Sequence, residues 1–257
     1  MPTLLLALAL ARPAAAGDAA PLAAWLPWSA PARIAEDHGM IRADGGASLG
    51  GESTLSAGGF VEGAPTSRVA VRVGGGWGGS GDADADADSS LSLYGTVRGD
   101  LLRQEKSGLN LAAAATYKRT GFGGSAGEVE GTLAASHTFS GLETGGALTF
   151  GHALDRDEGD AELALHATRV LGGGFSAGVD MRGRARLGED CGDEPEACAG
   201  EETDADADHA ADWAGGPVLA WSKGPAVILV VPGAQVVAGP GGVQTGATAM
   251  ASVGVGF

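Results

Sequence analysis

The chain has 257 residues and a formal net charge of −16, because 16 Lys and Arg stand against 32 Asp and Glu. A protein that binds nucleic acid needs a basic surface, and no stretch here is rich in Lys or Arg, so we expect no nucleic-acid partner. Aromatic residues are 5% of the chain, while 44% is apolar, mostly Ala, Val and Leu. The chain therefore has few of the bulky side chains that fill a large core in a soluble protein.

Residues 1–16 predict a secretory signal peptide. An apolar run from Leu4 to Ala11 is followed by small residues that end at Ala16, as an Ala-x-Ala cleavage site requires. The run is shorter than the roughly 20 residues of a membrane-spanning helix. No Lys or Arg precedes it, so an uncleaved apolar N-terminus is the alternative. We interpret residues 17–38 as a periplasmic linker.

The remainder of the chain alternates with period two. In residues 175–187 apolar or small side chains alternate with mostly polar ones, and the pattern recurs in 91–101, 129–139 and 243–257. A β-strand places the two sets on opposite faces. Strands of globular sheets favour about 5 or 6 residues, whereas a tilted membrane strand needs about 9 to 11. The long runs therefore favour a transmembrane β-barrel over a soluble β-sandwich, which would need shorter strands and bulkier core residues.

Twelve strands are predicted, and twelve is an even number, as a closed bacterial barrel needs. The two weakest are 39–49 and 53–63, so ten strands preceded by an N-terminal plug or linker is the alternative. The strand at 226–238 is apolar on both faces and contains Pro232, which cannot donate to a ladder, so we expect a bulge or kink there. The other nine predicted strands are 67–78, 89–103, 108–119, 127–139, 141–154, 160–171, 174–187, 213–223 and 241–257.

The connections between these strands alternate in length and charge. One set is long, and 19 of the 32 acidic residues lie in it or beside it. Long outer loops and short periplasmic turns are typical of membrane barrels. The predicted outer connections are 79–88, 120–126, 155–159, 188–212 and 239–240; the predicted inner ones are 104–107, 140, 172–173 and 224–225. Outward aromatic residues are expected at two levels, as in interfacial girdles: Trp77, Tyr117, Phe150 and Trp213 near the outer rim, and Phe139, Phe175, Trp221 and Phe257 near the inner rim.

The chain ends on Phe257 after an alternating run. This resembles the C-terminal signature strand of bacterial outer-membrane β-barrel proteins. The resemblance extends over roughly residues 40–257 and indicates a porin-like class without a specific family. It implies an outer-membrane location, contact with membrane lipid and lipopolysaccharide, and recognition of Phe257 by the barrel-assembly machinery. We therefore expect an all-β, closed antiparallel barrel over residues 39–257, as a monomer.

Charged residues on the inward faces form the candidate site. Arg182, Arg184 and Arg186 follow one strand, and three guanidinium groups at a constriction could form an anion-attracting filter. Alternatively, ion pairs with glutamates fill the lumen and close it, because small barrels are filled by side chains and large ones are open. The complete set of predicted pore-lining residues is Arg182, Arg184, Arg186, Glu162, Glu130, Lys118, Arg98, Asp100 and Arg72.

The outer connections hold two further candidate features. Cys191 and Cys198 predict a disulfide in an exported chain, while metal binding is the weaker interpretation because His209 is the only imidazole nearby. Alternating carboxylates could hold Ca²⁺ loosely, but the EF-hand pattern fails and a solvated loop is favoured. We expect no other cofactor. The carboxylates concerned are Asp82, Asp84, Asp86 and Asp88.

No catalytic constellation is predicted. Outer-membrane phospholipases with twelve strands resemble this architecture and use a His/Ser pair, but His137 would lie opposite Thr144, and His152 opposite Val129. The predicted function is a narrow pore for diffusion of small solutes, not an enzyme. The alternative is a closed structural or surface-interaction barrel whose acidic extracellular loops bind cations or a partner.

Overall fold

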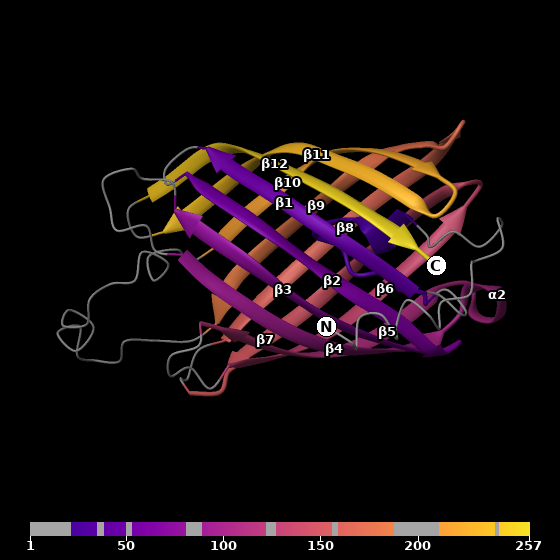
Figure 1. Ribbon diagram of the computed structural model, residues 1–257, viewed down its shortest axis with the longest axis horizontal. Coiled ribbons are helices and arrows are strands. Elements are labelled where there is room, and N and C mark those ends of the chain that lie inside the picture. Colours follow the sequence, from indigo (N-terminus) through magenta and orange to yellow (C-terminus); the bar gives the residue numbers. More distant parts are fainter. Residues whose placement is uncertain are drawn as a thin grey trace, which may run out of the picture.

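The computed structural model describes residues 22–34, 39–49, 53–80, 89–121, 127–155, 159–187, 211–239 and 242–257. Within these residues twelve strands follow one another in chain order, each antiparallel to its neighbours, and pairing of the first with the last closes the barrel (Figure 1). This confirms the predicted fold class and the count of twelve strands. Among the described residues, no helix has both the length and the apolar character needed to cross a membrane.

The strands are 11 to 15 residues long, as the alternating pattern predicts. Their bounds are β1 Gly39–Leu49, β2 Thr54–Thr66, β3 Val69–Ser80, β4 Ser89–Leu102, β5 Asn110–Thr120, β6 Glu128–Phe139, β7 Leu142–Ala153, β8 Gly159–Gly172, β9 Phe175–Leu187, β10 Ala211–Lys223, β11 Ala226–Gly239 and β12 Gly242–Gly256. Two short helices accompany them, η1 at Leu22–Trp25 and α2 at Gln104–Ser107.

The two faces of the wall differ as the alternation requires. On β4, the outward Leu91 and Leu93 are about half exposed (45% and 50%), whereas the inward Arg98 and Asp100 are each 7% exposed. Lipid tolerates such an outward face without close packing. Six of the aromatic residues expected at the rims are exposed on the outward face: Trp77, Tyr117, Phe150, Trp213, Phe139 and Phe175.

The two ends of the barrel differ. At the turn end, which holds both ends of the barrel domain, Ser140 and Gly141 form a tight turn with φ of 48° and 77°, the left-handed values that a two-residue hairpin favours. Gly39 and Phe257 exchange two backbone hydrogen bonds there, of 2.6 and 2.8 Å. The opposite end, here called the loop end, carries the connections after β1, β3, β5, β7, β9 and β11 (Figure 1).

Several predicted features lie outside the described residues. These are the signal peptide at 1–16, the acidic tract from Asp82 to Asp88, and the cysteine pair Cys191 and Cys198. They remain predictions. The assembly role of Phe257 also stays a prediction, although its backbone position beside Gly39 is described.

The bulge expected at Pro232 is absent. The β10–β11 ladder is interrupted between Gly215↔Ala234 and Leu219↔Val230, but the pairing offset is the same on both sides of the gap. That offset places Pro217 opposite Pro232, and neither proline has an N–H to donate. The β11–β12 ladder runs through Pro232 without a shift. The two prolines therefore remove backbone hydrogen bonds from the β10–β11 ladder without changing its register.

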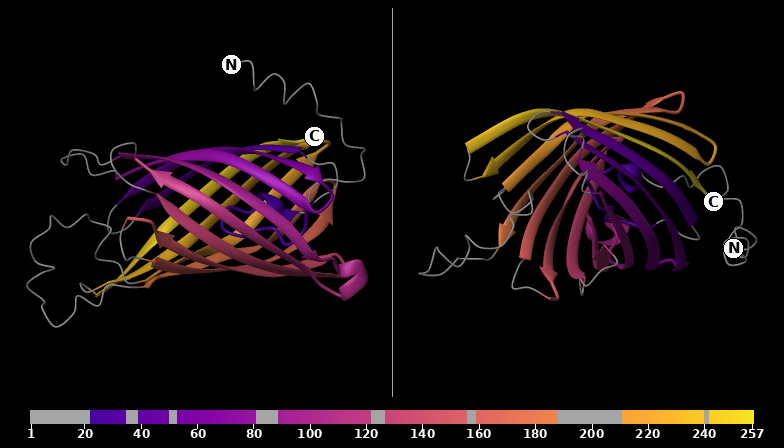
Figure 2. Two further views of the ribbon diagram at one scale, coloured as in Figure 1. Left: turned by 90° about the horizontal axis from the view of Figure 1, so that it is seen from below. Right: turned by 60° about the vertical axis from the view of Figure 1, so that its left-hand side comes forward.

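Residues 22–34 lie inside the lumen (Figure 2), although we expected residues 17–38 to be a periplasmic linker. We call residues 22–34 the plug segment. Pro27 disfavours helical backbone at the residue before it, so η1 ends at Trp25. Trp25 and Leu26 are each 2% exposed, and Gly254 leaves room for the indole, because a Cβ there would lie 2.4 Å from the ring.

The plug segment explains the strand that is apolar on both faces. The outward residues of β11 point away from the barrel, while its inward Val227, Leu229 and Val231 form one buried cluster with Trp25 and Leu26. The second apolar face of β11 therefore packs inside the lumen.

Candidate functional site in the barrel lumen

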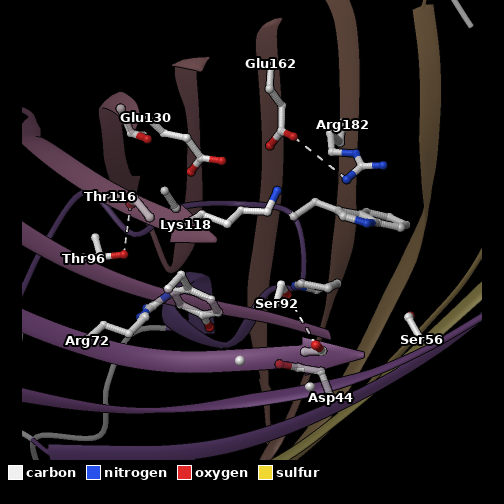
Figure 3. A pocket seen from close by; sticks show the side chains of 18 of the residues that line it. Asp44, Ser56, Arg72, Ser92, Thr96, Thr116, Lys118, Glu130, Glu162 and Arg182 are labelled. Atoms are coloured by element: carbon white, nitrogen blue, oxygen red, sulfur yellow. Dashed lines mark hydrogen bonds and ion pairs between the residues drawn. The ribbon is translucent and has the colours of Figure 1, made fainter. Parts of the chain in front are cut away.

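A cavity of about 1030 Å³ occupies the lumen above the plug segment (Figure 3). Pro27–Pro31 line it from below, and Thr120 and Arg186 line it near the loop end. Among the described residues its charged lining is balanced, with six acidic and six basic side chains. These are Asp44, Glu62, Glu128, Glu130, Glu162 and Asp212, and Arg72, Arg98, Lys118, Arg182, Arg184 and Arg186.

The structure places eight of the nine predicted pore-lining residues around this cavity. The ninth, Asp100, lies below it, where its carboxylate accepts the backbone N–H of Ile34 at 3.1 Å. Four further acidic residues, which were not predicted from the sequence, also line the cavity: Asp44, Glu62, Glu128 and Asp212. Glu62 lies in a predicted strand, 53–63, so the same inward–outward alternation could have identified it.

A buried ion-pair cluster forms the wall on β2–β4. Glu62 lies directly opposite Arg72 in the β2–β3 ladder, and their side chains are 2.9 Å apart. The other oxygen of Glu62 accepts a hydrogen bond of 3.0 Å from Arg98. The Arg72 guanidinium also lies 3.9 Å from the centre of the Phe60 ring, a cation–π contact. One carboxylate thus holds two arginines against the wall and out of the cavity centre.

The opposite wall carries the predicted arginine ladder on β9. Arg182 pairs with Asp212 at 3.2 Å and with Glu162 at 3.9 Å (Figure 3). Arg184 pairs with Asp160 of the neighbouring strand. These two arginines are therefore ion-paired, as the closed-lumen alternative requires, yet the cavity beside them remains open.

The wall on β5–β6 differs, because one carboxylate there has no cationic partner. Lys118 lies 3.5 Å from Glu128, whereas Glu130 makes no ion pair with any described residue. In Figure 3 the Glu130 side chain points into the cavity. Its charge is available to a passing cation or to water.

Uncharged hydroxyls separate the charged groups. Thr96 and Thr116 lie opposite each other on β4 and β5 with their oxygens 2.9 Å apart, and Thr132 and Thr149 repeat the arrangement on β6 and β7. No cluster of three or more potential metal ligands occurs among the described residues. The arrangement can hydrate and orient small polar solutes.

Buried polar groups at the bottom of the lumen hold the plug segment. Asp180, which has no exposed surface, accepts hydrogen bonds from Trp28 N at 3.1 Å and from Ser29 Oγ at 2.6 Å. Arg42 donates a 3.0 Å hydrogen bond to the carbonyl oxygen of Leu26. Neither Asp180 nor Arg42 was singled out from the sequence, because their partners lie in a segment expected outside the barrel.

The register predicted for the two outward histidines is confirmed. His137 pairs with Thr144 and His152 pairs with Val129, so neither histidine faces a serine across the β6–β7 ladder.

The protein was compared with known families, curated proteins and solved structures. No family model and no curated protein matches the sequence. An outer membrane channel from Pseudomonas putida F1 has a similar structure, with a TM-score of 0.62 and 11% identity over 90% of this chain and 98% of that chain. The NanC porin gives a TM-score of 0.57 at 7% identity, over 84% of this chain and 98% of that chain.

At these identities the likeness concerns the fold alone. The chain therefore shares the closed antiparallel β-barrel fold of these two outer-membrane proteins, with an apolar outward face.

Proposed function

We propose that this barrel is a narrow channel through which small polar solutes diffuse across the bacterial outer membrane. The observation that carries the proposal is the charged, hydroxyl-lined cavity of about 1030 Å³ within a closed barrel. Barrels of about 8 strands are filled by side chains and those of 16 to 18 leave a wide aqueous channel, so twelve strands fit a narrow passage. The names of the two similar structures, a porin and a channel, support the same reading.

The closed structural barrel fits the lumen less well. Such a barrel would fill its interior with paired side chains, whereas here the paired Arg182 and Arg184 border open space.

The balanced lining predicts the direction in which substitutions change ion selectivity. Replacing Arg182, Arg184 and Arg186 together by Ala leaves six acidic and three basic residues around the cavity, so permeation should shift toward cations. Glu130→Gln should shift it toward anions, because it removes a carboxylate that lines the cavity and forms no ion pair with a described residue. The measurement is the reversal potential of the refolded protein in a planar bilayer under a KCl gradient.

Arg169→Ala is the control, because Arg169 lies on the outward side of β8 near the turn end and its loss changes the charge of the protein but not of the cavity. A reversal potential that is the same in the wild type, the triple variant and Glu130→Gln would contradict a permeation path along this lining. Inserted protein that never conducts, with or without the plug segment, would refute the channel function itself.

A further inference from the structure

The plug segment is attached to the barrel in a way that differs from every strand. Within the described residues the β1–β12 pairing closes the wall without any residue of 22–34, and no strand pairs with this segment. Its removal would therefore break no cross-strand hydrogen bond. The wall and the plug segment are separate in their hydrogen bonding, although they belong to one chain.

The contacts that hold the plug segment are apolar and polar, and they include the Arg42 hydrogen bond to Leu26 and the exposed ion pair between Arg33 and Glu105. An apolar contact places Trp25 and Leu26 against the inner face of β10 and β11. Polar contacts fix the backbone further along: Asp180 holds Trp28 and Ser29, and Asp100 holds Ile34. The segment is thus anchored at both ends of its path through the lumen.

The carboxylate of Asp180, the main polar contact of the plug segment, has no ion pair among the described residues to offset its burial. Asp180 is fully buried and has no ion pair among the described residues; its bonds to the plug segment come from a backbone N–H and a hydroxyl, both neutral donors. A buried carboxylate without a cationic partner is costly to keep from water. Solvent that enters the lumen can replace both donors, so the two hydrogen bonds, of 3.1 and 2.6 Å, hold the segment reversibly.

The position of the plug segment gives it a direct effect on passage. Pro27–Pro31 form the lower lining of the cavity, so a solute that enters from the loop end meets this segment before the turn end. Trp25 and Leu26 lie in the lumen in one buried cluster with the inward Val227, Leu229 and Val231 of β11.

We propose that residues 22–34 form a displaceable gate, latched in the closed position by Asp180, and that the channel conducts when this segment leaves the inner face of β10 and β11. This inference rests on the proposed channel function. The latch predicts that wild-type channels are closed most of the time and open in bursts. It also makes Asp180 a positioning residue, which acts on passage only through the plug segment.

The first test removes the latch. In single-channel recordings, Asp180→Ala should raise the ratio of open to closed time by about tenfold or more, because two hydrogen bonds to a buried carboxylate are lost. Asp180→Asn keeps an oxygen acceptor for Trp28 and should raise the ratio less. Ser29→Ala should also raise it, whereas Ser222→Ala should not, because the Ser222 hydroxyl bonds Gly174 at the turn end and not the plug segment.

The second test keeps the gate in place covalently. Ser29→Cys with Asp180→Cys, in a chain that also carries Cys191→Ser and Cys198→Ser, should be silent when oxidised and should conduct after reduction. Equal conductance in both redox states, with the cross-link verified by mass spectrometry, would overturn the gate.

Deletion of residues 22–34 separates the two proposals. The inference expects the deleted protein to conduct almost continuously, with a larger unitary current than the wild type. If wild type and deletion conduct identically, the channel function stands and the gate is wrong. If the inserted deletion variant is silent, the channel function itself fails.

Discussion

Glu62 shows how much depends on single charges in this lumen. Its carboxylate neutralises both Arg72 and Arg98, and the Glu62 and Arg98 side chains are only 6% and 8% exposed. Removal of one partner from a buried ion pair leaves an uncompensated charge, so Glu62→Ala should lower the free energy of unfolding by about 3 to 5 kcal/mol. Urea unfolding of the barrel in lipid vesicles measures this loss.

The control is Glu105→Ala. Glu105 and Arg33 form an ion pair of similar length, 2.9 Å, but their side chains are 54% and 44% exposed. A pair in contact with solvent contributes about 0 to 1 kcal/mol. Similar losses for the two variants would mean that solvent screens Glu62 as well as it screens Glu105.

At the residue scale, the sequence predicted which side chains face inward better than what they contact. Alternation placed Arg182 and Glu162 on the lumen side, where the structure has them. Asp180 lies two positions before Arg182 and therefore faces the same side of the strand. Its hydrogen-bond partners, however, are Trp28 and Ser29, about 150 positions away in the chain. No local pattern encodes such a contact.

At the scale of the element, β11 is the most instructive strand. Period-two alternation separates a lipid face from a polar face, and it fails where both faces are apolar. A second apolar face indicates a partner inside the lumen, but the plug segment is short and non-repetitive, so the sequence does not identify it as that partner. Of the bulge or kink expected at Pro232, the bulge is absent for a related reason, since Pro217 on the adjacent strand faces Pro232 and the register continues across the interrupted ladder.

The dual role of β11 predicts an energetic coupling with the plug segment. Leu229 has no exposed surface and belongs to the cluster that contains Trp25. Leu229→Ala should therefore cost about 2 to 5 kcal/mol in the intact chain. In a chain that lacks residues 22–34 the same substitution should cost less, with a coupling of about 0.5 to 3 kcal/mol. A double-mutant cycle on unfolding free energies measures the coupling.

Leu219→Ala serves as the matched control, because Leu219 lies on the neighbouring β10 but is 56% exposed on the outward face. Its effect should be the same with and without the plug segment. Coupling of equal size for Leu219 and Leu229 would show that deletion of the segment perturbs the whole wall.

At the scale of the whole molecule, the strand count and nearly every strand boundary could be predicted, because lipid imposes strand length and alternation on each strand alike. The content of the lumen could not be predicted in the same way. It depends on contacts of the plug segment with distant strands, which the period-two alternation does not indicate. The sequence also predicts a difference in charge between the two ends, because acidic residues gather in the connections that follow β3, β7 and β9.

That asymmetry predicts a salt-dependent effect on conduction. The connection between β9 and β10 contains ten acidic residues between positions 189 and 210, and it joins two strands at the loop end of the barrel. Carboxylates at a mouth attract cations over about 10 Å at 0.1 M salt but only about 3 Å at 1 M. Deletion of residues 189–210 should therefore reduce the current carried by cations at 0.05 M KCl several-fold and change it little at 1 M.

A matched variant with the ten acids replaced by Asn or Gln keeps the length of the connection and separates the effect of charge from that of bulk. At low salt it should reproduce the effect of the deletion. If it behaves as the wild type at 0.05 M KCl, the acidic rim does not concentrate cations, and the charges inside the lumen alone set selectivity.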